Sequence, residues 1–390
     1  MEFTSKFNEL KSLFCLHQNV IDIPGSDIEI RNYDFSSGTS LAFPFEDHYD
    51  PYSYNQQLIN RDENIRENVS FRYPVFVPKS NTKFNHAIFL MHGLNEKKWN
   101  KYLPWAYYLA ENTQRPVILF PMSFHMNRSP ESWANPKAMM PLLYQRQGLK
   151  NLAMSTFANV ALSERLSEDP LRFFRSGRQS AEDIVDLMHA LKMGKHPLIE
   201  ADAQVDFFAY SIGAFLAQIL FIANPQGLFS NSKLFLFCGG THFNHMYGTS
   251  RLIMDNQAYF SLRKYYLGEF IDELKLNTPF SNFITGNPLG NAFRAMLAPK
   301  ILRSYRENIF QKLSNHIKII ALKKDKVTPA NYIEYTFSCI RNRMKNMIEV
   351  IDFPYEYSHE VPFPINANPN YLIVDQSFER VFRSAVDFLK

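Results

Sequence analysis

Short apolar segments alternate along the chain with segments of helical periodicity. Six runs rich in Val, Ile, Leu and Phe have the length and composition of buried strands. These runs are residues 86–91, 116–120, 205–210, 233–237, 317–322 and 347–353. Strands that are apolar throughout are typical of a parallel sheet covered on both faces. Residues 71–77 and 28–35 are predicted to add antiparallel strands at one edge.

Helical periodicity fills several of the intervals between these runs. In residues 180–193, apolar side chains recur at i, i+3, i+4 and i+7, and Ser180 with Asp183 predicts a capping box at the helix start. Residues 330–345 and 376–390 are also predicted to be helical. The pattern therefore predicts an α/β fold with a mostly parallel central sheet covered by helices on both faces.

Two connections are much longer than the usual few residues between a strand and a helix. Residues 122–170 and 241–315 each follow a predicted strand, so they leave the sheet at its carboxyl edge, where open α/β sheets bind ligands. We expect residues 241–315 to form a helical cap whose aromatic side chains line the substrate pocket. The alternative is that these aromatics form the core of the cap itself. They are Tyr247, Tyr259, Phe260, Tyr265, Tyr266, Phe270, Phe280 and Phe283.

Composition removes several classes of function. The 390 residues contain no GxGxxG, GxxxxGK[ST], HExxH or CxxC motif, so nicotinamide, P-loop and common zinc sites have no motif support. The net charge of +4 is spread along the chain, which argues against nucleic-acid binding. Three scattered cysteines fit a reducing compartment and predict a cytoplasmic protein. Residues 1–16 lack the apolar core of a signal peptide, and residues 207–232 fit a buried strand and helix better than a transmembrane segment.

The strongest chemical signal surrounds Ser211. An apolar strand runs directly into this serine and an apolar helix follows at once, with small residues two positions before and after it, Ala209 and Gly213. Such a sharp turn strains the backbone and lifts the hydroxyl above the sheet. The alternative is a serine that only caps the helix. Ser36 also precedes a glycine by two positions, but no helix follows it.

A second turn can supply an oxyanion hole, which needs two backbone N–H groups directed at the developing charge. The strand ending at Met91 is followed by His92 and Gly93, and Leu94 stands in the position of the first donor. Ile212, next to the serine at the start of the helix, stands in the position of the second. The alternative is an ordinary glycine turn with a packed histidine.

Together these features resemble the α/β-hydrolase superfamily, over about residues 70–390. Ala209 departs from the G-x-S-x-G pattern of that superfamily, in which the chain order is nucleophile, acid, histidine. The resemblance implies that Ser211 is the nucleophile, Asp325 the acid and His359 the base. Asp325 and His359 each follow a predicted strand, in that order. It also implies supporting roles for His92, Gly93 and Gly213.

The resemblance implies a serine hydrolase that needs neither cofactor nor metal and acts on a small-molecule ester with an apolar part. A peptidase or amidase of the same fold and a catalytically silent binding module are the alternatives. The core is expected to span residues 71–390 with insertions 122–170 and 241–315, and residues 1–70 to pack on it in an unknown role. No charged pocket is apparent, and the oligomeric state is not predicted.

Other residues at strand ends are weaker candidates. His242 and His245 have the spacing of a metal-ligand pair but lack a third ligand. His125 and Arg128 follow another strand and could contact a substrate. Cys238 precedes two glycines, but a buried cysteine is the simpler interpretation.

Overall fold

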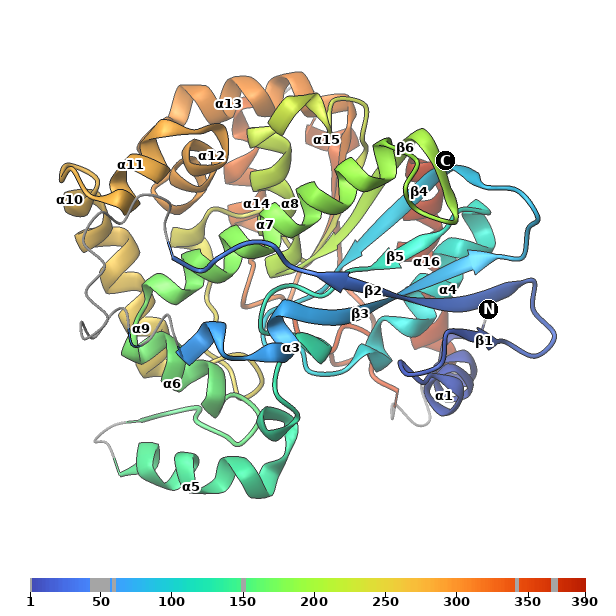
Figure 1. Ribbon diagram of the computed structural model, residues 1–390, viewed down its shortest axis with the longest axis horizontal. Coiled ribbons are helices and arrows are strands. Elements are labelled where there is room, and N and C mark those ends of the chain that lie inside the picture. Colours follow the sequence, from blue (N-terminus) through green and yellow to red (C-terminus); the bar gives the residue numbers. More distant parts are fainter. Residues whose placement is uncertain (1, 43–56, 58–60, 149–151, 341–343, 366–370) are drawn as a thin grey trace.

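The computed structural model describes residues 2–42, 57, 61–148, 152–340, 344–365 and 371–390. Within them, nine strands form one sheet in the order β1-β2-β3-β5-β4-β6-β7-β8-β9 (Figure 1). The strands are β1 (Val20–Asp22), β2 (Ile28–Ser36), β3 (Ser70–Pro78), β4 (Phe84–Met91), β5 (Val117–Leu119), β6 (Ile199–Tyr210), β7 (Leu234–Phe237), β8 (Ile317–Leu322) and β9 (Ile348–Ile351).

The direction of pairing changes once across this sheet. The pairs β1–β2, β2–β3 and β3–β5 are antiparallel, and all pairs from β5–β4 to β8–β9 are parallel. The carboxyl ends of β4, β6, β7 and β8 therefore meet at one edge. The chain has the α/β-hydrolase fold, as the sequence predicts.

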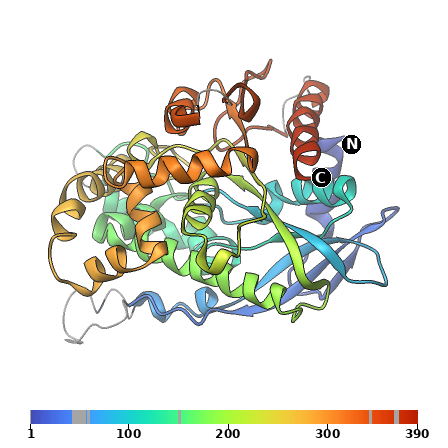
Figure 2. The same ribbon diagram turned by 90° about the horizontal axis from the view of Figure 1, so that it is seen from above.

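Helices cover both faces of the sheet, as Figure 2 shows from above. The helices are α1 (Phe3–Leu13), α3 (Arg66–Val69), α4 (Leu103–Thr113), α5 (Pro136–Gln147), α6 (Val160–Glu168), α7 (Leu171–Lys192), α8 (Ile212–Ala223), α9 (Asn256–Lys264), α10 (Phe270–Glu273), α11 (Pro279–Gly286), α12 (Pro288–Leu297), α13 (Arg303–Lys312), α14 (Ala330–Thr336), α15 (Met344–Met347) and α16 (Tyr371–Leu389). On one face α1, α4 and α16 pack with strand residues such as Phe208. On the other, α7, α8, α12 and α13 pack with the alternate residues, such as Phe207.

Every residue of α8 is buried, which explains the long charge-free run after Ser211. A helix enclosed by protein on all sides has no polar face to present to water. In the described part of the chain, no helix combines the length and apolar character that a membrane span requires.

The described residues before β3 extend the sheet. β2 pairs with β3 along its whole length, from Ile28 opposite Pro78 to Ser36 opposite Ser70, and β1 pairs with β2. Helix α1 packs on α4 and α16, where Phe3 stacks on Phe378 with ring centroids 4.4 Å apart. The two antiparallel strands were predicted correctly, but the short outer strand β1 was not.

The two long insertions pack against each other. Arg146 of α5 binds Asp255, the N-cap of α9, through two hydrogen bonds of 2.8 and 2.9 Å. Thr156 donates a hydrogen bond to the carbonyl of Arg251, and α6 packs on α9. Farther along the second insertion, α12 packs on α8, away from α9 (Figure 1).

The boundaries of α7 and α14 differ from the predicted ones. Helix α7 begins at Leu171, nine residues before the predicted cap, so Ser180 and Asp183 lie inside it. The Ser180 hydroxyl instead donates to the carbonyl of Ser176, and Asp183 pairs with buried Arg128 at 2.8 Å. The predicted helix 330–345 ends as α14 at Thr336, and residues 341–343 lie outside the described chain.

Candidate active site

Ser211 lies at the sharp turn between β6 and α8. Its backbone has φ 57° and ψ −122°, a region that residues with a side chain rarely adopt. The N–H of Gly213 donates to the carbonyl of His92 at 3.1 Å, which attaches the start of α8 to the end of β4. The strain predicted from the strand–serine–helix pattern is therefore present at this residue.

Two glycines make room for this turn. A Cβ atom on Gly213 would lie 2.7 Å from the carbonyl oxygen of His92, so no side chain fits there. A Cβ atom on Gly239 would lie 2.4 Å from the Cβ of Ala214 and 3.1 Å from the carbonyl oxygen of Ser211. The sequence indicated the need for Gly213, but Gly239 comes from the next strand along and only the fold brings it here.

This crowding predicts that Gly239→Ala destabilises the protein. Neither contact is the end of a flexible side chain, so we expect a loss of about 3 kcal/mol in the free energy of unfolding, the upper end for overpacking. Gly268→Ala is the matched control, because nothing lies within 4 Å of a Cβ there, and it should change stability by less than about 1 kcal/mol. Denaturant unfolding of both variants measures the difference, and equal stabilities would contradict the prediction.

The structure brings Ser211, His359 and Asp325 together in one hydrogen-bonded chain. The Oγ of Ser211 lies 2.6 Å from Nε2 of His359, and Nδ1 of His359 lies 2.7 Å from Oδ2 of Asp325. All three residues are buried. Because the carboxylate accepts the Nδ1–H, Nε2 is left to accept the proton of the serine hydroxyl.

Asp325 is held in place by its own loop. Its Oδ1 accepts the backbone N–H groups of Val327 and Thr328 at 2.8 and 2.9 Å. Its Oδ2 accepts the Thr328 hydroxyl at 2.9 Å in addition to His359. Four donors thus fix the orientation of the carboxylate.

Leu94 and Ile212 have backbone N–H groups available beside the serine. Within the described residues, neither group donates a hydrogen bond to the protein. His92 orders this turn: its Nδ1 donates to the carbonyl of Gly93 and its Nε2 accepts the N–H of Met122, both at 2.9 Å. Burial lowers the pKa of His92 to about 3, so it stays neutral and joins the ends of β4 and β5.

A polar cluster that the sequence analysis did not identify supports the His359 loop. The hydroxyl of Tyr210 donates to the carbonyl of His359, and its ring stacks on the imidazole with centroids 5.5 Å apart. Lys101 donates to the carbonyl of Glu360 at 3.1 Å and to Glu96. The position of Tyr210, directly before Ser211, was the available signal in the sequence.

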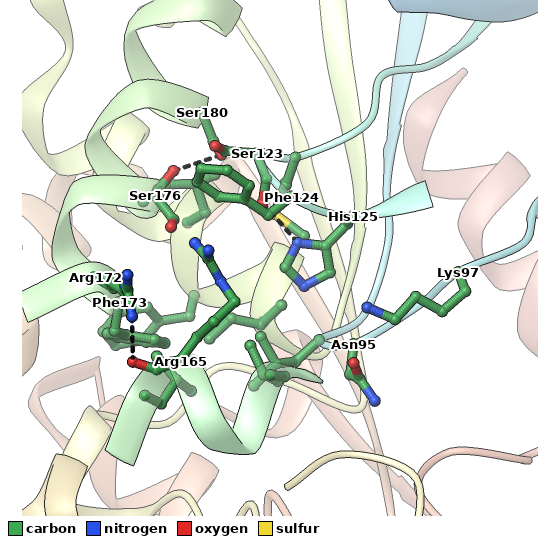
Figure 3. A pocket seen from close by; sticks show the side chains of 18 of the residues that line it. Asn95, Lys97, Ser123, Phe124, His125, Arg165, Arg172, Phe173, Ser176 and Ser180 are labelled. Atoms are coloured by element: carbon green, nitrogen blue, oxygen red, sulfur yellow. Dashed lines mark hydrogen bonds between the residues drawn. The ribbon is translucent and has the colours of Figure 1, made fainter. Parts of the chain in front are cut away.

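Three cavities meet at Leu94. The serine cavity, about 40 Å³, contains Ser211 and apolar side chains from the second insertion such as Phe243, Met254 and Tyr259. The inner cavity, about 70 Å³, lies beyond Leu94 and Ile212 and is drawn in Figure 3. The outer groove, about 420 Å³, runs past Phe3 and Phe363. Ser211 lines the serine cavity, and Leu94 is the residue that the inner cavity and the outer groove both share with it.

The weaker candidates from the sequence lie mostly in packed or ion-paired surroundings. His245 stacks on Tyr332 at 4.1 Å, and the described residues contain no group of three or more metal-ligating side chains. Burial raises the pKa of the Cys238 thiol well above its usual range, which disfavours a reactive thiolate. Arg128 is fully buried in its ion pair with Asp183. Of these candidates, only His125 lines a cavity beside the serine.

Several solved structures are similar to this chain at low sequence identity. The chain is similar to a hyperthermophilic esterase from the archaeon Pyrobaculum calidifontis, with 11% identity, a TM-score of 0.44 and coverage of 98% of this chain and 90% of that one. It is also similar to carboxyl esterase 2 from the mycorrhizal fungus Tuber melanosporum, with 10% identity, a TM-score of 0.43 and coverage of 99% of this chain and 98% of that one. A third similar structure is a putative dipeptidyl aminopeptidase IV from Bacteroides ovatus, with 13% identity and a TM-score of 0.43. The match covers 93% of this chain and 36% of that one.

A search of curated protein sequences returns no match. One family model matches all of residues 1–390, and its description is "Family of unknown function (DUF6051)". The chain is therefore a member of the DUF6051 family, with an α/β-hydrolase fold.

Proposed function

We propose that the protein is a serine hydrolase that cleaves carboxylic esters through an acyl-enzyme on Ser211. The observation that carries this proposal is the hydrogen-bonded chain from Ser211 through His359 to Asp325. It is supported by the strained turn at Ser211 and by the two backbone N–H groups beside it. A serine that only capped α8 would need neither the histidine nor the strain, and this serine makes no side-chain cap bond to the helix.

The geometry fits each step of acyl transfer. The Ser211 oxygen attacks the ester carbonyl carbon while Nε2 of His359 takes the hydroxyl proton. The N–H groups of Leu94 and Ile212 stabilise the negative charge on the carbonyl oxygen. The C–O bond to the alcohol then breaks, and His359 returns the proton to the leaving alkoxide. Water, activated by the same nitrogen, hydrolyses the acyl-enzyme and regenerates the serine.

The second insertion supplies an apolar cover for this serine. Its first part, from Phe243 to Leu262, contributes seven of the twelve residues that line the serine cavity. Tyr266, Phe270 and Phe280 are buried instead in the core of the insertion, where Phe174 of α7 packs on Phe280. The alternative interpretation therefore describes these three residues, and Tyr259 is the one predicted aromatic that lines the serine cavity. We propose that the first part acts as the substrate cap, and that dryness there favours an ester with an apolar part.

Tyr259 and Phe260 are adjacent aromatics that test this cap. Tyr259 lines the serine cavity, whereas Phe260 is 67% exposed. Loss of one buried aromatic contact is worth about 1.5–3 kcal/mol, so Tyr259→Ala should lower kcat/KM for longer acyl chains by roughly 10-fold or more relative to acetate. Phe260→Ala should leave the chain-length profile unchanged. Equal profiles for both variants in a p-nitrophenyl ester series would contradict a cap role.

One experiment separates the three functional classes. A fluorophosphonate probe should label the protein at Ser211. Labelling shows that the serine is activated, and turnover shows whether the protein is an enzyme. Turnover of p-nitrophenyl esters with little turnover of aminoacyl anilides supports an esterase. The reverse preference would make the protein an amidase or peptidase, and absence of both labelling and turnover would favour the binding module.

A further inference from the structure

The inner cavity has one apolar side and one cationic side. Leu162, Leu166, Phe215 and Leu216 form apolar wall next to Ile212. Lys97, Arg165 and Arg172 also line the cavity, and no Asp or Glu is among its described lining residues. Figure 3 shows the Arg165 side chain crossing the cavity and Lys97 approaching from the opposite side. This pocket could not be predicted from the sequence, because its cations come from separate parts of the chain.

The two arginines already have anionic partners behind the cavity wall. Arg165 binds both carboxylate oxygens of Asp62, at 2.6 and 3.1 Å. Arg172 binds the same carboxylate at 2.8 Å and also pairs with Glu168 at 2.5 Å. These carboxylates hold both guanidinium groups in place, so the cationic side of the cavity is fixed before any ligand binds.

Lys97 differs because, among the described residues, its ammonium has no carboxylate partner. It lies over the Trp133 ring, 5.3 Å from the centroid. Burial, together with the charge of Arg165, lowers the pKa of Lys97 to about 7. A partly buried ammonium without a counter-ion is costly, and an anion in the cavity would remove that cost.

His125 provides an acceptor on the same side. Its Nδ1 lies 2.8 Å from the carbonyl oxygen of Ser123, so Nδ1 carries the proton and Nε2 has a free lone pair. This Nε2 is buried without a hydrogen-bond partner in the described chain. Figure 3 shows Lys97 directed toward His125. The imidazole can therefore orient the Lys97 ammonium and leave its other N–H groups for a ligand.

We infer that the acyl group of the substrate ends in a carboxylate, which binds Lys97 in the inner cavity. This inference rests on the proposed esterase activity and names its substrate class as monoesters of dicarboxylic acids. The serine cavity and the inner cavity share Leu94 and Ile212. With the ester carbonyl at these two residues, the acyl chain begins beside Tyr259 in the serine cavity and continues along the apolar wall of the inner cavity, where the carboxylate reaches the cationic side. Hydrolysis breaks the ester C–O bond, adds one water and releases the dicarboxylate and the alcohol.

The test compares two nearly isosteric esters, monomethyl glutarate and its ω-amide, by methanol release. A charge-assisted hydrogen bond is worth about 1.5–3 kcal/mol, so wild type should prefer the carboxylate by about 10- to 100-fold in kcat/KM. Lys97→Met should abolish this preference, and Lys97→Arg should retain most of it. Lys98→Met is the matched control: Lys98 is exposed and outside the inner cavity, so the preference should stay.

The outcomes distinguish this inference from the proposed function. Equal or better turnover of the ω-amide by wild type would overturn the carboxylate and leave the esterase intact. Turnover of short neutral esters but of neither glutarate derivative would do the same, as would a preference that survives in Lys97→Met. If no ester of any kind is hydrolysed, the proposed function itself fails, and the substrate class fails with it.

Discussion

Ser211→Ala is expected to abolish ester hydrolysis, with a loss in kcat of roughly 10⁶-fold. The estimate is the loss seen when the nucleophile of the serine protease subtilisin is removed. Without the Oγ atom, 2.6 Å from Nε2 of His359, no acyl-enzyme can form, and only binding and the oxyanion contacts remain. Initial rates on a p-nitrophenyl ester at high enzyme concentration measure the residual activity.

The matched control for this variant is Ser36→Ala. Ser36 also stands two residues before a glycine, but it is exposed at the end of β2. Its removal should leave both turnover and fluorophosphonate labelling unchanged. Ser211→Ala should lose both while it unfolds at nearly the same temperature as wild type. Retention of more than about a tenth of the activity in Ser211→Ala would exclude it as the nucleophile.

The positions of Ser211, Asp325 and His359 could be anticipated because each depends on local pattern and chain order. A parallel sheet places the ends of successive strands at one edge, so the loops that follow β6, β8 and β9 meet there. The start of α7 could not be read in the same way, because its first turns are stabilised by tertiary contacts. For example, the hydroxyl of Tyr266, which belongs to the second insertion, accepts the backbone N–H of Phe174 in α7.

Contacts between distant segments also explain the missed parts of the site. Gly239 matters only because β7 lies beside β6, which places it against Ala214. In the sequence, Lys97 cannot be told apart from its exposed neighbour Lys98. The side chains around Lys97 in the cavity come from the first insertion and α7. Periodicity reports which face of an element is buried, but it does not report which polar side chains the fold encloses together.

Asp325→Asn is expected to lower kcat by about 10⁴-fold, because it reverses the proton arrangement of His359. Oδ1 of Asp325 accepts two backbone N–H groups, so the amide oxygen of Asn must occupy that position. The NH₂ group then takes the place of Oδ2 and faces Nδ1 of His359, 2.7 Å away in the wild type. Two donors cannot face each other, so Nδ1 gives up its proton and Nε2 carries it. A protonated Nε2 cannot accept the proton of Ser211.

The unfolding temperature of Asp325→Asn distinguishes a chemical effect from loss of structure. The variant keeps both loop hydrogen bonds at Oδ1, so its unfolding temperature should stay close to that of wild type. Asp325→Ala removes them and should be destabilised by about 1–3 kcal/mol for each backbone donor left without a partner. Asp352→Asn is the surface control, since this exposed carboxylate binds the Tyr357 hydroxyl and pairs with exposed Lys323. Fluorophosphonate labelling should slow in Asp325→Asn in parallel with turnover. A folded Asp325→Asn variant within about 10-fold of wild-type kcat would show that another acid, or none, orients His359.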